Sequence, residues 1–196
     1  PAAPPQPHHE QPALPAPNAL HAGSYAARMT LNLREDNPWS NGARSLLQEA
    51  DGQRPFHLYA PVQTDKTKES MAEIYSEVSG ILGERPPTSD EIARAKDKST
   101  LTLVGRWETA NAVASSLAEM VRFDLPDNYW EEYPEMVRSL SEDQVADAAK
   151  TVVRPDNMVW VVVGDRAKIE EGISELEFGD IILMDADGNV LEQPGG

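Results

Sequence analysis

Apolar and polar side chains recur along the chain with two different periods, and these periods separate predicted strands from predicted helices. Between residues 54 and 62 the alternation is strict, which predicts a strand with one buried face. Its apolar members are Phe56, Leu58 and Ala60, and its polar members are His57 and Tyr59. Residues 39–50 predict a preceding strand, and Asp51-Gly52 between the two is a strong hairpin signal. We therefore expect an antiparallel pair.

From Thr64 to Leu82 the apolar spacing becomes helical, and a helix is also predicted over 18–37, where Asn37-Pro38 ends it. The apolar face of the 64–82 helix consists of Met71, Ile74, Tyr75, Val78, Ile81 and Leu82. Further helices are predicted over residues 89–104, 107–123, 125–140 and 142–153. Thr88 with Glu91 and Ser141 with Gln144 form capping boxes, which begin two of these helices.

The strand pattern returns near the end of the chain. Residues 157–165 are apolar on both faces, which predicts a central strand covered on both sides. A helix over 166–176 and a hairpin over 178–192, which turns at Asp187-Gly188, complete the pattern. The expected fold class is α+β: a mainly antiparallel sheet with helices packed on one face.

The composition restricts the classes of partner. With 17 Lys and Arg against 33 Asp and Glu, the net charge of −16 argues against nucleic acid as a partner. No apolar run is long enough for membrane insertion, and the absence of cysteine excludes disulfides and thiolate sites. Residues 1–17 are rich in proline and predict a disordered arm before a domain at 18–196. His8, His9 and Glu10 lie on that arm, which offers no scaffold for a metal site.

Motifs for catalysis are missing from the sequence. Asp185, Asp187 and Asn189 have the spacing of a calcium loop, but Val190 replaces the required glycine and Gly196 the bidentate glutamate, so a β-turn is expected. The sequence contains neither a glycine-rich phosphate loop nor a G-x-S-x-G elbow. It also contains neither H-E-x-x-H nor H-x-x-E-H. On its own chemistry the chain is not an enzyme.

Five segments occur in an order that resembles one known family. They are ARMTLNLREDNPWSNGARS, RPFHLYAPVQTDKTKESMAEI, RPPTSDEIARAKDKSTLTLVGRWETANAVASSLAEM, LPDNYWEEYP and VRPDNMVWVVVGD. Together they cover roughly residues 18–190 and resemble the insulinase/pitrilysin family of zinc metallopeptidases. The similarity is to the C-terminal domain of the bacterial zinc-protease branch, which is related to mitochondrial processing peptidase.

The resemblance implies a partial domain of the LuxS/MPP-like metallopeptidase fold whose N-terminal part is missing here. In the family, domains close around an unfolded peptide and a single domain carries the zinc motif. The resemblance therefore implies that this chain binds no cofactor, that zinc lies on a catalytic partner domain or subunit, and that the chain alone is inactive. Bacterial relatives are often exported, so a periplasmic location is one alternative and the compartment stays open.

The resemblance also implies a pair of substrate-binding residues. In the family, an arginine at a helix end and a tyrosine seven residues later hold the substrate; Arg34 matches the arginine, and Asn41 stands at the tyrosine position. A structural alternative is that Arg34 only caps the helix C-terminus and pairs with neighbouring carboxylates. The acidic charge suits a basic peptide. The alternative function is a scaffold of the same fold that binds a partner and has no peptidase role.

Overall fold

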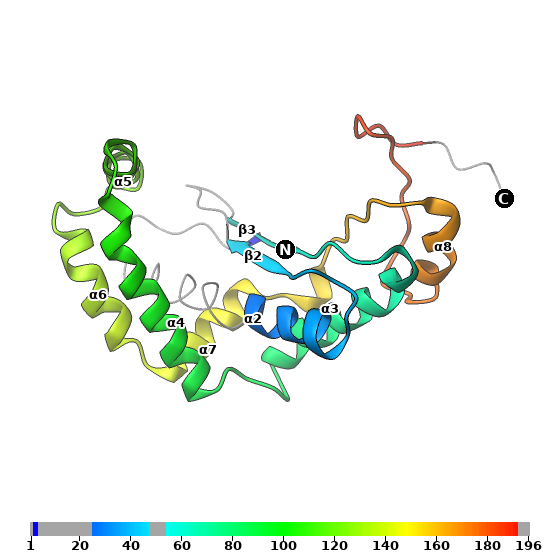
Figure 1. The fold of residues 1–196 in the computed structure, drawn as a ribbon, viewed down its shortest axis with the longest axis horizontal. Coiled ribbons are helices and arrows are strands. Elements are labelled where there is room, and N and C mark those ends of the chain that lie inside the picture. The colour runs from blue at the N-terminus through cyan, green and yellow to red at the C-terminus, as the bar shows by residue number, and fades with distance from the viewer. Residues whose placement is uncertain (1, 4–24, 48–53, 192–196) are drawn as a thin grey trace.

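The computed structural model describes residues 2–3, 25–47 and 54–191 of the chain, and helices predominate in this part. The helices are α2 (Tyr25–Thr30), α3 (Thr67–Ile81), α4 (Ser89–Leu101), α5 (Ala110–Arg122), α6 (Tyr129–Ser139), α7 (Glu142–Val152) and α8 (Arg166–Ser174). Shorter helical turns are η2 (Leu31–Asp36), η3 (Thr64–Lys66), η4 (Thr102–Trp107) and η5 (Pro155–Asn157). They form an arc with α4, α5 and α6 at one end, α2 and α3 at the centre, and α8 at the other end (Figure 1).

The strands form a small antiparallel sheet in the order β1-β3-β2. β2 (Arg44–Leu47) and β3 (Arg54–Tyr59) pair in a register that sets Leu47 opposite Phe56, and β1 (Ala2–Ala3) pairs with the start of β3. Phe56 is buried while Tyr59 is 55% exposed, so the predicted hairpin and its one buried face are confirmed. The turn predicted at Asp51-Gly52 lies outside the described residues.

The main core lies between this sheet and the helices α2, α3 and α7. It consists of Met29, Leu33, Leu47, Phe56, Ile74, Val78, Ile81, Ile92, Leu140, Val145, Ala149, Val152 and Val153. The apolar face predicted for the 64–82 helix therefore packs against the chain's own sheet and helices. Both predicted capping boxes are confirmed, at the starts of α4 and α7.

A second, aromatic cluster joins η4 to α6. Its buried members are Leu103, Leu125, Tyr129, Tyr133 and Val137. The guanidinium of Arg106 lies over the ring of Trp130, 3.9 Å from its centroid, while its Nε donates to the Ser116 hydroxyl at 3.1 Å. These contacts connect α5 to the aromatic cluster. They also place Arg106 over the Trp130 ring, so this ring takes part in packing within the fold.

The expectation of a mainly antiparallel sheet is wrong for the described residues. The sequence predicts a central strand over residues 157–165, but residues 158–164 run extended between η5 and α8 without a strand partner in the described part of the chain (Figure 1). Val159, Val161 and Val163 are 82%, 86% and 94% exposed. The hairpin predicted over 178–192 is reduced to one bridge between Met184 and Val190. An apolar pattern indicates that both faces of a strand are suited to burial, but it does not provide the strands and helices that would bury them.

The N-terminal domain boundary stays a prediction. Residues 1 and 4–17 of the proline-rich arm, with His8, His9 and Glu10, lie outside the described residues, as do residues 18–24 of the first predicted helix. The helix is present from Tyr25 and ends where Asn37 adopts an extended conformation before proline, as expected.

Candidate functional site

Arg34 lies in η2, which continues α2 as a π-helical turn. The wider turn is visible in its hydrogen bonding, because the Asn37 amide donates to the Asn32 carbonyl at 2.8 Å. Leu33 is buried beside it, so the neighbouring Arg34 points outward with its side chain 58% exposed. Its Nε lies 3.5 Å from a Glu35 carboxylate oxygen. The side chain is thus accessible to a ligand, and its position in the last turn also fits the capping alternative.

Asn41 lies in the short connection between η2 and β2 rather than on a strand. The preceding Ser40 forms a bridge with Val62, and its hydroxyl donates to the Pro61 carbonyl at 2.6 Å. Asn41 itself is exposed, and no interaction with Arg34 occurs among the described residues. The structure therefore places both predicted site residues on the surface, close in sequence but not joined.

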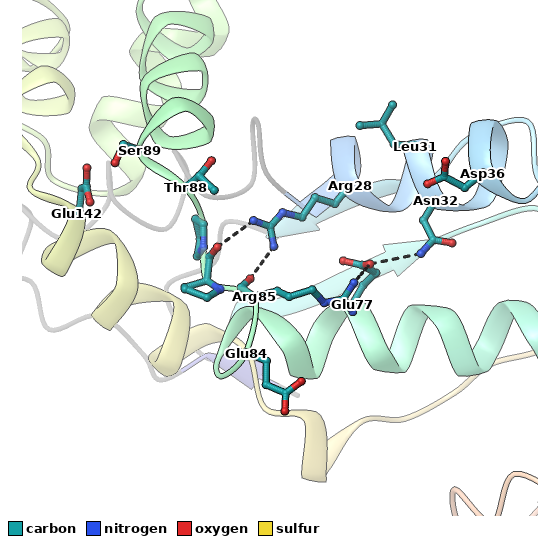
Figure 2. Close-up of a pocket in the computed structure, with 12 residues that line it drawn as sticks. Arg28, Leu31, Asn32, Asp36, Glu77, Glu84, Arg85, Thr88, Ser89 and Glu142 are labelled. Atoms are coloured by element: carbon teal, nitrogen blue, oxygen red, sulfur yellow. Dashed lines mark hydrogen bonds and ion pairs between the residues drawn. The ribbon is translucent and has the colours of Figure 1, made fainter.

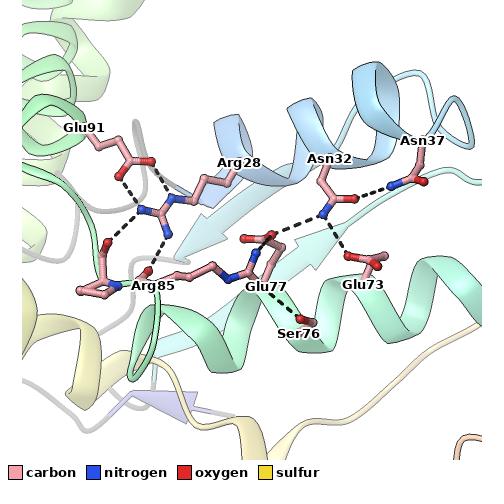
Figure 3. Close-up of polar contacts among 9 residues, drawn as sticks. Arg28, Asn32, Asn37, Glu73, Ser76, Glu77, Arg85 and Glu91 are labelled. Carbon is pink, nitrogen blue, oxygen red and sulfur yellow. Dashed lines mark hydrogen bonds and ion pairs between the residues drawn. The ribbon is translucent and has the colours of Figure 1, made fainter.

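A polar clamp that sequence reasoning missed holds the adjacent turn of α2. The Arg28 guanidinium binds both oxygens of Glu91, each at 2.5 Å (Figure 3). It also donates to the carbonyls of Arg85 at 2.6 Å and Pro86 at 2.9 Å. One cation thus fixes α2, the loop after α3 and the start of α4 at once, and bidentate pairing of this kind is geometrically specific.

The clamp changes the acidity of Glu91. The hydrogen bonds from Arg28 lower the pKa of this carboxyl to about 2, partial burial opposes the shift, and the Thr88 amide and hydroxyl add to it. The same carboxylate closes the capping box of α4 by accepting from the Thr88 amide at 2.8 Å. The Glu91 carboxylate therefore stays ionised at neutral and mildly acidic pH.

A second polar chain follows the clamp along α3. The Arg85 guanidinium donates to Glu77 at 2.8 Å, and the Asn32 amide donates to Glu73 at 3.0 Å and Glu77 at 3.4 Å (Figure 3). The Glu77 side chain is only 8% exposed, so this buried carboxylate depends on Arg85 and Asn32 for its partners. Asn37 in turn donates to Asn32 at 3.0 Å, which connects the end of η2 to the network.

An open cleft of about 770 Å³ lies over these contacts, between α2, η2 and the loop that joins α3 to α4 (Figure 2). Its lining is Arg28, Leu31, Asn32, Asp36, Glu77, Glu84, Arg85, Pro86, Pro87, Thr88, Ser89 and Glu142. Both cationic residues of this lining are bound to carboxylates, whereas Asp36, Glu84 and Glu142 form no ion pair within the described residues. The cleft is therefore acidic. Arg34 lies on η2 between lining residues but is not itself part of the lining.

A catalytic metal does not fit the described part of the chain. No group of three or more His, Asp or Glu side chains there is placed to share a metal ion. The carboxylate of Asp185 is used by its own turn, where it accepts from the amides of Asp187 at 2.9 Å and Asn189 at 2.8 Å. The predicted β-turn is thus confirmed at the sequence that has calcium-loop spacing. No helix in the described ranges is long and apolar enough to cross a membrane.

Solved structures show what this fold resembles. The chain is similar to an inactive domain of peptidase M16 from Pseudomonas fluorescens (TM-score 0.63, 18% identity, 78% of this chain and 37% of that chain). It is also similar to the periplasmic protease PqqL from Escherichia coli (0.63, 16%, 76% and 16%) and to a protease from Helicobacter pylori (0.61, 17%, 76% and 36%). No protein-family model and no curated protein matches the sequence.

These similarities confirm the resemblance at the level of the fold. The chain has the fold of a region of these solved proteins, one of which is an inactive domain of peptidase M16. The chain spans well under half the length of each of the three solved chains named above. Identities of this size define the fold, so activity and substrate have to be argued from the site.

Proposed function

We propose that the chain is a non-catalytic, substrate-embracing domain or subunit of a zinc metalloendopeptidase of the insulinase/pitrilysin family. The observation that carries the proposal is the fold, which is shared with a solved inactive domain of an M16 peptidase. The described residues offer no cluster that could hold zinc, so in this proposal the metal belongs to a catalytic partner domain or subunit. The chain contributes a wall for the peptide and takes part in closing the chamber.

Two surface features support a role in peptide binding. Arg34 is exposed and can donate two parallel hydrogen bonds to a peptide carboxylate or backbone carbonyl. The neighbouring cleft presents Asp36, Glu84 and Glu142 without ion-pair partners in the described structure, and the whole chain has a net charge of −16. Such a surface attracts basic, unfolded peptides and repels acidic ones.

The test of the proposed function is reconstitution of cleavage. The intact chain is used as bait in an extract of its source organism, and the captured complex is assayed with a quenched basic peptide, with and without a zinc chelator. We expect chelator-sensitive cleavage only when bait and partner are together. Capture of a partner without cleavage would favour the scaffold alternative. The structural support for that alternative is that Arg34 and Asn41 do not contact each other among the described residues. Zinc-dependent cleavage by the bait alone would contradict the assignment as non-catalytic.

Substitution of Arg34 should weaken peptide binding without affecting the fold. We expect Arg34→Ala to lower the affinity for a basic, unfolded peptide about five- to thirtyfold, because a charge-assisted hydrogen bond contributes roughly 1–2 kcal/mol. Fluorescence anisotropy of a labelled peptide measures this change. Arg94→Ala is the matched control, because Arg94 is also exposed but lies on α4.

Asn41→Tyr is the complementary change at the family tyrosine position. A phenol reaches further than an amide and adds an aromatic face, so we expect tighter peptide binding in this variant. If neither Arg34→Ala nor Asn41→Tyr changes the affinity, these residues do not contact the peptide. A stronger affinity for an acidic peptide of equal length would contradict the electrostatic part of the proposal.

A further inference from the structure

The connection between η2 and β2 contains the dipeptide Asn41-Gly42, and hydrogen bonds hold the chain on both sides of it. On one side Ser40 is held by an isolated β-bridge. On the other side the Thr30 hydroxyl donates to the Ala43 carbonyl at 3.1 Å and accepts from the Ala43 amide at 3.2 Å. The Asn41 side chain is exposed and makes no hydrogen bond to another described residue. Its amide group is therefore accessible to reaction.

The backbone at Gly42 is also open to reaction. Gly42 has a φ of +139°, a conformation that favours glycine. A Cβ placed there would have the Thr30 methyl as its nearest neighbour, at 3.9 Å, so few atoms crowd this residue. The Gly42 amide donates to the Ser40 hydroxyl at 3.1 Å and belongs to no helix or sheet. Release of the Gly42 nitrogen therefore costs one hydrogen bond to a side chain and breaks no regular secondary structure.

We propose that Asn41 is a site of spontaneous deamidation through a cyclic succinimide. The Gly42 backbone nitrogen attacks the side-chain Cγ of Asn41, and the new C–N bond closes the ring. The bond from Cγ to the side-chain amide nitrogen breaks, and this nitrogen leaves as ammonia with the proton that the Gly42 amide loses. Water then opens the ring. Opening at the side-chain carbonyl gives aspartate, whereas opening at the main-chain carbonyl gives isoaspartate.

Two other asparagines show what the reaction requires. Asn37 precedes proline, whose ring nitrogen carries no hydrogen and cannot form the succinimide. Asn189 is exposed at the end of a turn, but its side chain donates to Asp185 at 2.9 Å and the following Val190 has a branched Cβ that hinders the attack. Asn41 combines an exposed, unbonded side-chain amide with a following glycine, so it has both features that Asn37 and Asn189 lack.

The reaction changes both the charge and the main-chain length of this connection. Either product introduces a carboxylate at position 41, where the resemblance implies a substrate-binding residue. Isoaspartate also adds one carbon to the main chain. Because the chain is held at Ser40 and Ala43, the longer connection should loosen the hydrogen bonds between Thr30 and Ala43. Any effect on peptide binding rests on the proposed function, whereas the reaction itself does not.

The experiment is incubation of the intact chain at neutral and at mildly alkaline pH, followed by trypsin digestion and mass spectrometry. Cleavage after Arg34 and Arg44 releases residues 35–44, which contain Asn41. We expect this peptide to gain the mass of an amide-to-acid conversion, faster at alkaline pH, and an isoaspartyl methyltransferase to label the product. Asn189 is the internal control and should convert at least about tenfold more slowly, because valine follows it.

Asn41→Gln is the matched variant, because glutamine keeps the amide but has to close a larger ring. Both the mass gain of residues 35–44 and the isoaspartyl label should disappear in this variant. Its circular dichroism should match that of the starting chain, since Asn41 is exposed. An unchanged mass for residues 35–44, over an incubation that deamidates a synthetic peptide of the same sequence, overturns the proposal. A mass gain that persists in Asn41→Gln overturns it as well.

Discussion

Replacement of Leu33 by alanine is expected to lower the free energy of unfolding by about 3 kcal/mol, since buried leucine-to-alanine changes typically cost about 2–5 kcal/mol. Leu33 is 1% exposed and belongs to the main core with Met29 and Val78. Its carbonyl also accepts the amides of Trp39 at 3.0 Å and Ser40 at 2.9 Å. The lost side chain therefore leaves a cavity beneath η2, the turn that presents Arg34.

The matched control for Leu33 lies two residues away in the same turn. Leu31 is 56% exposed, so Leu31→Ala should change the free energy of unfolding by no more than about 0.5 kcal/mol. Urea denaturation followed by circular dichroism measures both variants, and equal m-values would show that the unfolded states are comparable. Equal losses for Leu31→Ala and Leu33→Ala would show that the inward face of η2 is misassigned.

Local patterns in the sequence predicted the local structure well. The alternation around Phe56 gave the buried face of β3, and Thr88 with Glu91 gave the start of α4. These features depend on side chains within a few residues of one another. Their energies are set by a strand's period of two or by one helical turn, so a single sequence contains the necessary information.

Predictions that depended on distant neighbours failed. The valine-rich pattern at 157–165 indicated burial on both faces, but burial needs strands from elsewhere, and the described residues place none beside it. The π-helical turn at Leu31–Asp36 was also missed, because its helical spacing of apolar residues does not reveal the wider hydrogen bonding.

The candidate site was predicted only in part. The resemblance drew attention to Arg34, and the structure places this side chain on the surface, where its role can be tested. Arg28 had no recognisable signal, since its partner Glu91 is 63 residues away. A capping box identifies Glu91 as a cap, but nothing local shows which distant cation it meets.

Arg28→Met is expected to lower the free energy of unfolding at neutral pH by about 2–3 kcal/mol, because one partner of a partly buried, hydrogen-bonded charge pair is lost. Methionine retains the apolar stem, so the change reports mainly on the guanidinium. It leaves the Glu91 carboxylate without its cation, and the carbonyls of Arg85 and Pro86 lose a donor. Arg94→Met is the control, since Arg94 is exposed on the same helix as Glu91.

The same variant should alter how stability depends on pH. In the folded protein the pKa of Glu91 is lowered from 4.5 to about 2, so its contribution is present above pH 4.5 and disappears as the pH falls towards 2. The full shift corresponds to roughly 3 kcal/mol, which solvent at the open side of the clamp reduces to about 1–2 kcal/mol.

The difference in stability between the starting protein and Arg28→Met should therefore shrink between pH 5 and pH 2.5, whereas the small difference for Arg94→Met should stay constant. Urea titrations across this pH range measure both differences. A difference for Arg28→Met that does not change with pH would mean that Arg28 stabilises the fold by packing alone. The loop that lines the acidic cleft would then be held by something other than the Arg28–Glu91 pair.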